Sequence, residues 1–494
     1  MDSPVQIPFQ NFIQLNPADK TAIYLQIVFG FVNGIQLGLL PEGTKLPGTR
    51  LLCKALNVNR NTLIKAFQDL ESQGWIEILP NKGTFILSNQ KQESKLVKAF
   101  AVDQVSNRSK GFPFKRSTVL ENPIEESSLK FQFNDGLPDF RILETDVLAR
   151  LYLAKLKAKS RAKSWQDLIT QSRINVRKQF SNFLNLTRGL GISNLNLLTT
   201  SSHEIGLYLV AKALIEEGDQ VVVASPGYYK SSMTLADCGA QLISVSNEKD
   251  GINTRELEAV CKKHRIRALY LTSNYHYPTT TVLSAKKRME VLELANRYEF
   301  VILEDDYDFD FHYDNYPALP LAAYDTWKRV IYIGSFGRSL PSGFGYGFIT
   351  ATPEFIAELE KHQNILEPEV DFIKQQALTD WVQDGEVHRL LKKNRKIYRD
   401  RRDHFVALLN AKLNGRIKFQ VPARGLAVWV EWTDEFSLMK LRGKCASNGL
   451  FLPKTILYQD KTITATRLGF SHFTHIEMEQ VIDVLKQSLE SLIS

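Results

Sequence analysis

The sequence of 494 residues contains few cysteines and histidines and no long apolar run. Because its four cysteines (Cys53, Cys238, Cys261 and Cys445) are scattered and form no CxxC pair, we expect reduced thiols rather than disulfides or a zinc site. The nine histidines form no HExxH motif, so we predict no metal site. No segment approaches the roughly 18 apolar residues of a membrane span, and the N-terminal residues lack the pattern of a secretory signal. These absences predict a cytoplasmic protein without a membrane partner.

The sequence also lacks a local excess of one charge where a nucleic acid would need it. Its formal net charge is +8, which suits a nucleic-acid partner without demonstrating one. Residues 1–86, however, hold seven Lys and Arg against six Asp and Glu. Net charge therefore does not decide the function, and the argument depends on motifs.

Three zones differ in their pattern. Residues 88–130 are rich in Ser, Asn, Lys and Glu without sustained periodicity, so we predict a linker that separates a domain at 1–87 from one at 131–494. In the third zone short apolar runs alternate with amphipathic helical patterns such as 284–298, which is typical of an α/β domain with a mainly parallel sheet. The predicted strands are 220–225, 266–273, 299–306 and 329–336. Ligands collect at the carboxyl ends of such strands, so we expect the site around 225–230, 273–280, 304–307 and 335–345.

The first zone predicts a helix-turn-helix followed by a hairpin. Apolar residues at Ile23, Ile27, Phe31 and Ile35 give the first helix a buried stripe. After a break rich in Pro and Gly, we expect a short helix capped by Thr49 and ending at Leu56. The turn at 57–59 then leads to a third helix that Asn59 caps and Gly74 ends, and residues 75–87 form a hairpin with its tip at 81–83.

This arrangement predicts specific DNA contacts. The first turn of the third helix would place Arg60, Asn61 and Thr62 at base edges in the major groove. Phosphates would be approached by Lys45 and Arg50, and the backbone or minor groove by Lys82 and Gly83 at the wing tip. A small helical bundle beside a hairpin, with no DNA partner, is the alternative interpretation.

The motifs of this zone resemble the winged helix of the GntR superfamily. The shared marks are the PxGxxLPxxR block at Pro41–Arg50, RxT at Arg60–Thr62, LxxxG at Leu70–Gly74 and GTF at Gly83–Phe85. The usual Ser before the helix arginine is Asn59, which can also cap a helix. The resemblance implies a partner of double-stranded operator DNA.

In the third zone, chemistry-bearing residues follow several predicted strands. They lie in SPGYYK (225–230), NYHYPTTT (274–281), EDDYDFDF (304–311) and TRLGFS (466–471). A pyridoxal-phosphate enzyme needs a lysine for the Schiff base, an acid at the pyridine nitrogen, a stacking aromatic ring, and cations for the phosphate and the substrate carboxylate. Acids at a strand end are more often capping or solvated groups, so the segments gain weight only from their order and spacing.

Residues 131–494 resemble the type I aminotransferase fold as it is used in MocR/GabR-type regulators. The resemblance implies that Asp305 is the acid at the pyridine nitrogen, that Tyr307 lies near the ring oxygen and that Tyr228 stacks on the ring. It also implies that Arg467 binds an effector carboxylate, where Lys230 adds a second cation. This domain would dimerise and hold an effector.

The departures from this family pattern all fall on cofactor positions. The Schiff-base lysine is replaced by Arg338, and the phosphate-binding arginine seven residues later by Gly345. Arginine stays protonated and offers no free amine to an aldehyde. Glycines of the phosphate loop and of the PTG turn read Ser201 and Thr280, and the serine before the lysine is Gly337. We therefore expect no covalent cofactor and no catalysis, with pyridoxal phosphate at most a weak noncovalent ligand.

The leading hypothesis is a homodimeric, DNA-binding transcription regulator whose second domain responds to an anionic small molecule held by Arg467, Lys230 or Arg338. One alternative is a pyridoxal-phosphate-dependent aminotransferase with an accessory DNA-binding domain. Another is a DNA-bound scaffold without any ligand. The basic stretches at 150–163 and 392–402 are interpreted as solvated helix faces, with a phosphate-contacting surface as the alternative.

Overall fold

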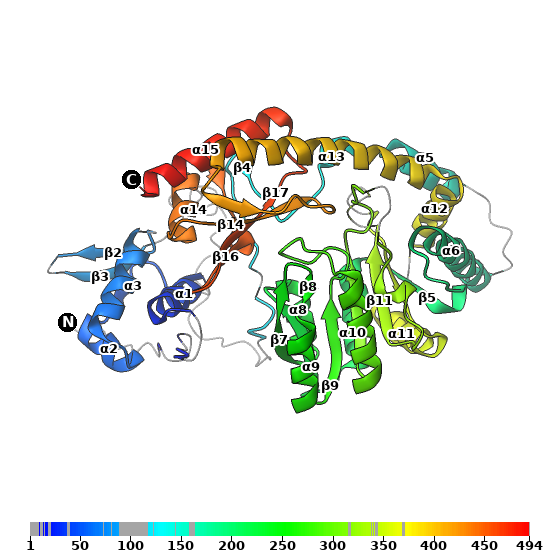
Figure 1. Ribbon diagram of the computed structural model, residues 1–494, viewed down its shortest axis with the longest axis horizontal. Helices are drawn as coiled ribbons and strands as arrows, with labels where there is room; N and C mark the ends of the chain where they lie inside the picture. The colour runs from blue at the N-terminus through cyan, green and yellow to red at the C-terminus, as the bar shows by residue number, and fades with distance from the viewer. Residues whose placement is uncertain are drawn as a thin grey trace, which may run out of the picture.

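The fold is taken from a computed structural model of the chain (Figure 1). The structure describes residues 9, 13, 15–17, 21–36, 40–72, 74–80, 82–87, 117–121, 123–143, 145–157, 164–314, 318–336, 338, 340, 344–367 and 371–493. Of the predicted site residues, all lie within these ranges. Asn81 at the predicted wing tip, Gly337 and most of the predicted linker lie outside them.

The N-terminal module has the predicted three helices and hairpin. Its elements are α1 (Ile23–Gln36), β1 (Lys45–Leu46), α2 (Thr49–Leu56), α3 (Arg60–Ser72), β2 (Ile76–Leu79) and β3 (Gly83–Ile86). The strand β1 was not predicted; it pairs with β3 and makes an antiparallel sheet in the order β1-β3-β2. The prediction that Thr49 caps α2 was wrong, because the chain turns one residue earlier and Gly48 is the N-cap.

One apolar core holds this module together. Ile27 and Phe31 of α1 pack with Leu63 and Phe67 of α3, and all four side chains are buried. The Phe31 and Phe67 rings meet edge to face at 5.7 Å. The turn between α2 and α3 is made by Asn57 in the left-handed conformation (φ 50°), which asparagine tolerates better than most residues. The helix-turn-helix therefore forms as its sequence pattern predicts.

The second domain is built on a large sheet, as predicted. In the described part of the chain this sheet has eight strands in the order β5-β12-β11-β10-β9-β6-β7-β8. They are β5 (Leu197–Thr200), β12 (Gly347–Thr350), β11 (Val330–Ser335), β10 (Val301–Asp306), β9 (Ile266–Leu271), β6 (Gln220–Ser225), β7 (Gln241–Glu248) and β8 (Gly251–Ile252). The central strands β11, β10, β9, β6 and β7 run parallel, whereas β12 is antiparallel to both of its neighbours. The four predicted strands are among them.

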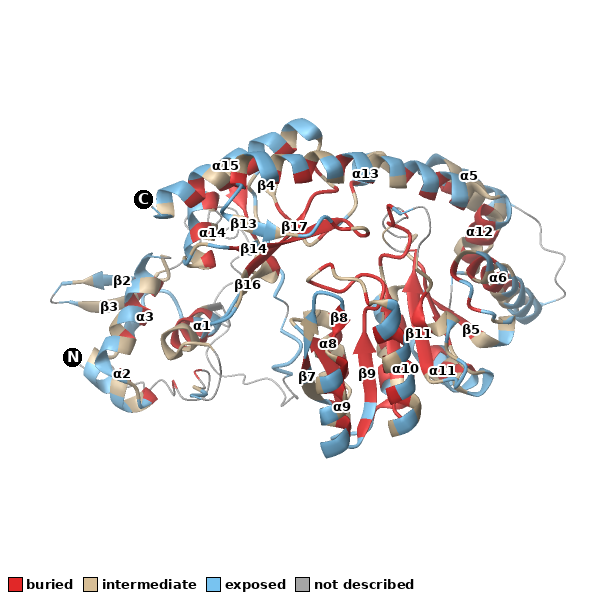
Figure 2. Ribbon diagram, in the orientation of Figure 1, coloured by how far each residue is buried: buried red, intermediate tan, exposed pale blue. Residues whose placement is uncertain are grey.

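Both faces of this sheet are buried, which explains why its strands read as continuous apolar runs. Alternate residues point to opposite faces, so Val221 and Val223 pack against α7 and α11 while Val222 packs against α9 and α10. Figure 2 shows the buried strands between helices whose outer faces are exposed. The helices of this layer are α7 (His203–Leu214), α8 (Tyr229–Asp237), α9 (Thr254–Lys263), α10 (Ala285–Tyr298) and α11 (Pro353–Leu366).

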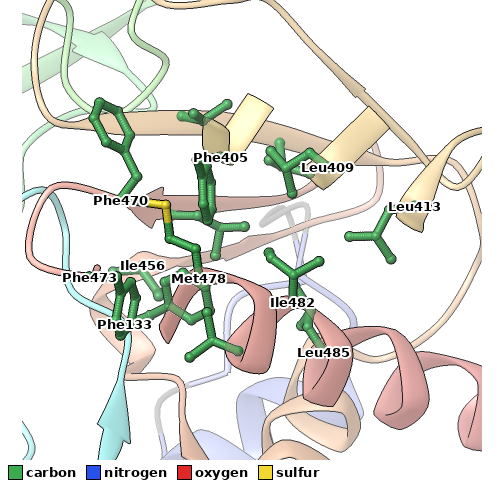
Figure 3. Packing of buried hydrophobic residues seen from close by; sticks show 14 of the residues in the cluster. Phe133, Phe405, Leu409, Leu413, Ile456, Phe470, Phe473, Met478, Ile482 and Leu485 are labelled. Carbon is green, nitrogen blue, oxygen red and sulfur yellow. The ribbon is translucent and has the colours of Figure 1, made fainter. Parts of the chain in front are cut away.

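A smaller sheet lies under two long C-terminal helices. Its order is β13-β14-β17-β16, with strands β13 (Ile417–Phe419), β14 (Ala427–Trp432), β17 (Thr464–Gly469) and β16 (Leu457–Gln459). Figure 3 shows Phe405 and Leu409 of one long helix packed with Met478 and Ile482 of the other. The helices here are α13 (Glu386–Leu413), α14 (Leu438–Ser447) and α15 (His475–Ile493), and a short pair of strands joins β4 (Phe131–Gln132) to β15 (Leu450–Phe451).

A third group of helices packs at the other end of α13 (Figure 1). It comprises α5 (Asp146–Lys157), α6 (Trp165–Arg188) and α12 (Phe372–Gln383); short 3-10 turns are η3 (Phe140–Ile142), η4 (Asn194–Asn196), η5 (Leu321–Ala323) and η6 (Lys454–Ile456). The described parts of the two basic stretches lie on α5 and α13, and residues 158–163 lie outside the described residues. On α13 Lys392 and Lys396 are exposed, whereas Arg401 is buried and pairs with Asp139, so this stretch is only partly solvated. All four cysteines are free thiols.

Neither a membrane-spanning helix nor a metal-binding cluster occurs among the described residues. None of the helices in these ranges is long and apolar enough to cross a membrane. The same ranges contain no group of three or more His, Cys, Asp or Glu that could hold a metal ion.

Candidate functional site

A cavity of about 570 Å³ opens at the carboxyl ends of the parallel strands, where the sequence placed the site. Five of the six predicted pocket residues line it: Tyr228, Lys230, Asp305, Tyr307 and Arg338. Tyr228 and Lys230 follow β6, Asp305 lies near the end of β10 with Tyr307 just after that strand, and Arg338 follows β11. The rings of Tyr228 and Tyr277 lie 4.6 Å apart and form one wall.

Asp305 is held by two partners within the protein. The Tyr270 hydroxyl donates a hydrogen bond to Asp305 Oδ2 at 2.6 Å, and His203 Nε2 lies 3.0 Å from the same oxygen. Burial alone would lower the pKa of His203, but the charge and hydrogen bond of Asp305 together with the charge of Glu204 outweigh burial and raise that pKa. Neither His203 nor Tyr270 was predicted.

Arg338, at the position of the expected lysine, bonds to other residues of the chain. Its Nη1 donates to the Gly136 carbonyl oxygen at 2.7 Å and lies 3.6 Å from Asp308 Oδ1, while its guanidinium carbon is 5.1 Å from the centre of the Tyr307 ring. Burial raises the pKa of Asp308 to about 6, and the charges of Arg338 and Arg467 limit that rise. Burial opposes the charge of Arg338 as well, but Asp308 and other neighbours raise its pKa, so it stays a cation.

Arg467 is not among the described residues that line the cavity. Its side chain is completely buried on β17, where Nε donates to the Asp135 carbonyl oxygen at 2.8 Å and Nη1 to the Pro278 carbonyl oxygen at 2.7 Å. Its guanidinium carbon lies 4.5 Å from the centre of the Tyr277 ring and 5.1 Å from that of Tyr275. Arg467 thus lies beside the cavity with two of its nitrogens bonded to backbone carbonyls, whereas its buried Nη2 has no hydrogen-bond partner among the described residues.

At the start of α7 a carboxylate of the chain itself accepts hydrogen bonds. The Ser201 backbone N–H donates to Glu367 Oε1 at 3.3 Å, and the Ser201 hydroxyl donates to the same oxygen. Gln363 Nε2 donates to Glu367 Oε2 at 3.2 Å and to the Thr199 carbonyl oxygen at 2.7 Å. Beside this loop, Gly345 supplies only a carbonyl, which lies 3.4 Å from Lys374 Nζ. Sequence reasoning singled out Ser201 and Gly345 but gave no signal for Glu367.

The segment before residue 131 also reaches the cavity. Ile124 and Glu125 line it. Glu125 accepts hydrogen bonds at 3.0 Å from Arg442 Nη2 and from the Lys454 backbone N–H, and it lies 3.3 Å from Lys454 Nζ. Lys454 Nζ in turn is 5.6 Å from the centre of the Trp75 ring in the N-terminal module. The end of the predicted linker is thus fixed to the second domain.

In the N-terminal module the predicted DNA contacts lie at the start of α3, on α2, on β1 and on the hairpin. The side chains of Lys45, Arg50, Asn59, Arg60, Asn61 and Lys82 are exposed, and Thr62 and Gly83 are half-buried. Asn59 Oδ1 accepts a hydrogen bond from the Asn61 backbone N–H at 3.2 Å, so Asn59 caps α3 as predicted. The first turn of α3 can therefore enter a groove without rearrangement of its core.

The cofactor requirements can be tested against this geometry. A Schiff base needs an unprotonated amine at residue 338, and the structure places there a guanidinium engaged with Asp308 and Gly136. A phosphate needs free backbone donors and a cation, and here the Ser201 donors are directed at Glu367. Asp305 and Tyr228 suit the ring, but the two ends of pyridoxal phosphate do not fit.

Comparisons with known proteins agree with the two-part fold. The family model for aminotransferase class I and II matches residues 148–485, and that for bacterial regulatory proteins of the gntR family matches residues 24–86. The uncharacterized HTH-type transcriptional regulator YdfD of Bacillus subtilis is 24% identical over 96% of this chain and 98% of its own. The HTH-type transcriptional regulator TauR of Rhodobacter capsulatus is 25% identical over 71% of this chain and 72% of its own.

Among solved structures, a multiple substrate aminotransferase from Thermococcus profundus superposes with a TM-score of 0.66 at 20% identity. The match covers 76% of this chain and 96% of that enzyme, and it shows a shared fold. The chain therefore belongs to the aminotransferase class I and II family, and it carries a gntR-family helix-turn-helix module before that domain.

Proposed function

We propose that the protein is a DNA-binding transcription regulator whose winged helix, residues 1–87, binds an operator and whose aminotransferase-like domain, residues 131–494, does not form a Schiff base. The observation that carries the proposal is the exposed first turn of α3, with Arg60 and Asn61 in solvent on a helix that the core fixes. The full-length similarity to an HTH-type regulator supports it. Such a protein acts where the chromosome is, which agrees with the expected cytoplasmic location.

Two observations support the lack of a Schiff base: an arginine replaces the expected lysine, and a carboxylate of the chain takes the donors expected to bind the phosphate. Arg338 bonds with Gly136 and pairs with Asp308, and its planar cation cannot act as a nucleophile at any ordinary pH. Incubation with pyridoxal phosphate followed by borohydride should therefore leave no adduct on a cavity peptide by mass spectrometry. An adduct at Lys230, with transaminase activity, would instead favour the aminotransferase alternative.

The domain's role in this proposal is to dimerise and to hold an effector. Proteins with the aminotransferase fold are commonly dimeric, and two winged helices in a symmetric dimer would bind paired half-sites. Of the three cations predicted to bind an anionic effector, Lys230 and Arg338 line the cavity, and Arg338 also bonds to Gly136. Arg467 lies outside the lining, with Nε bonded to Asp135 and Nη2 without a hydrogen-bond partner among the described residues. An operator affinity that no small molecule changes would favour the scaffold alternative.

The direct test is a mobility-shift titration on the DNA upstream of the protein's own gene. The R60A variant should lose binding by roughly 5- to 150-fold, corresponding to about 1–3 kcal/mol for an arginine that contacts a base pair. The matched control is K65A on the same helix, because Lys65 is exposed like Arg60 but its Nζ lies 4.0 Å from the centre of the Tyr24 ring in α1. Equal losses in R60A and K65A would contradict recognition through the first turn of α3.

A further inference from the structure

The start of α7 is a place where a folded protein can hold an anion. The first backbone N–H groups of a helix have no partner within the helix, and the helix dipole favours negative charge there. In this chain α7 begins at His203 after the N-cap Ser202, whose hydroxyl accepts from the Ile205 backbone N–H at 3.2 Å. Ser202, His203 and Glu204 line the cavity, so an anion on a ligand could reach the backbone N–H groups of this turn.

The chain's own carboxylate already stands at this turn. Glu367, at the end of α11, takes the Ser201 backbone N–H and hydroxyl on one oxygen and Gln363 Nε2 on the other. Gln363 is itself buried and anchored on Thr199 of β5, so the carboxylate is held from two elements. The donors that a phosphate would use at Ser201 are thus directed at a group that cannot leave the protein.

The charges around this end of the cavity also oppose a phosphate. Glu204, on the first turn of α7, lines the cavity and adds a second carboxylate. Gly345 brings no side chain, and the nearby Lys374 Nζ lies 3.4 Å from the Gly345 carbonyl. The charges that line the cavity are mixed, because Lys230 and Arg338 line it together with Glu204 and Asp305. At the start of α7, however, a phosphate dianion would lie beside Glu204 and would find the Ser201 donors taken by Glu367.

We propose that Glu367 and Glu204 make this cavity exclude phosphorylated compounds, so that its ligand is a ring compound without a phosphate group. The ring would lie against Tyr228 and Tyr277, with polar groups toward Asp305 and Lys230. This proposal about the ligand depends on the proposed function in one respect, namely that the cavity holds an effector. The exclusion of phosphate is a property of the folded domain and does not depend on DNA binding.

The experiment uses the full-length protein and a pair of amines that differ only in phosphate, pyridoxamine and pyridoxamine 5′-phosphate. Calorimetry gives their dissociation constants, and thermal unfolding in inorganic phosphate against chloride at equal ionic strength reports binding of the anion alone. In the E204A/E367A variant the ratio of the two dissociation constants should shift at least tenfold toward the phosphorylated amine. The variant should also gain thermal stability in phosphate that the wild type does not gain.

The matched control is E358A, because Glu358 lies on the same helix as Glu367 but is exposed and paired with Lys361. It should behave as the wild type in both measurements. E367Q, which keeps the shape of the side chain and an acceptor oxygen, is the second variant if the double alanine variant does not fold. A wild type that prefers the phosphorylated amine or is specifically stabilised by phosphate would overturn the proposal, as would variants without any shift. Neither result would affect the operator test with R60A.

Discussion

Arg338 and Asp308 form a buried pair whose two members depend on each other. Asp308 is completely enclosed, and Arg338 Nη1 is the cation at 3.6 Å from its Oδ1. The R338M variant should lower the free energy of unfolding by about 3 kcal/mol, because removal of one partner leaves a buried charge without compensation. Urea denaturation at neutral pH measures the loss.

The double variant R338M/D308N is the control for this prediction. With the carboxylate also neutral, most of the loss should be recovered, since an uncharged pair of similar shape can be nearly as stable as an ion pair. An equally large loss in the double variant would mean that Arg338 stabilises the domain through Gly136 or packing on Tyr307 instead.

The same carboxyl group predicts a pH dependence. Burial raises the pKa of Asp308 in the folded protein to about 6, against 3.8 for the exposed group. The native state therefore binds this proton more tightly than the unfolded state, and stability falls as pH rises from about 4 to 6. Between pH 4.5 and 7.5 the wild type should lose about 2 kcal/mol more than D308N. Parallel curves for the two proteins would show that Asp308 is already ionised at pH 4.5.

Site residues that belong to sequence motifs were predictable, whereas site residues that reach the site only through long-range contacts of the fold were not. Asp305, Tyr228 and Arg338 were found because they occupy fixed places in a recognised order along the chain. His203 and Glu367 act through partners 102 and 166 residues away, and nothing in their local sequence indicates those partners. Arg467 was found for its position, but its carbonyl partners arise only when β17 meets residues 135 and 278.

In the wing, backbone conformation favours glycine at position 83. Gly83 begins β3 with φ at +117°, and a Cβ there would lie 2.8 Å from Lys45 Cε on the paired strand β1. G83A should lower stability by about 1 kcal/mol or more, since alanine is strained at positive φ. It should also weaken operator binding, because Lys45 and the hairpin move together. Thermal unfolding and mobility shift measure the two effects.

G48A is the matched control, because Gly48 has φ at −57° and no atom lies within 4 Å of an added Cβ. It lies at the start of α2, close to the same surface, and should change neither quantity. If G83A changed neither thermal stability nor operator binding, the wing would not constrain Lys45.

The helices and strands of the chain were largely predictable from the sequence, because the apolar residues of strands buried on both faces and of amphipathic helices follow different spacings. The four predicted strands of the large sheet and the helix at 284–298 all formed. The strand β1 was missed because its two residues carry no period and exist as a strand only through pairing with β3. The short parallel pair of β4 and β15 joins residues 131 and 450, a distance along the chain that no local signal spans.

For the whole molecule, Glu125 is the residue that fixes the end of the linker segment to the second domain. In E125A the Lys454 backbone N–H loses its acceptor at 3.0 Å, and Arg442 loses its carboxylate. Hydrogen exchange at Lys454 should become faster, and operator affinity should change because Lys454 also faces Trp75. E126A, which removes an exposed neighbouring carboxylate, is the control. Unchanged exchange in E125A would mean that other contacts hold this segment.

Residues 124 and 125 belong to the wall of the cavity and also to the stretch of chain that leads from the winged helix. A compound bound in the cavity would therefore contact, at residues 124 and 125, the same segment that connects the second domain to the winged helix. Under the proposed function, ligand binding and the connection to the DNA-binding module meet at one wall of the cavity.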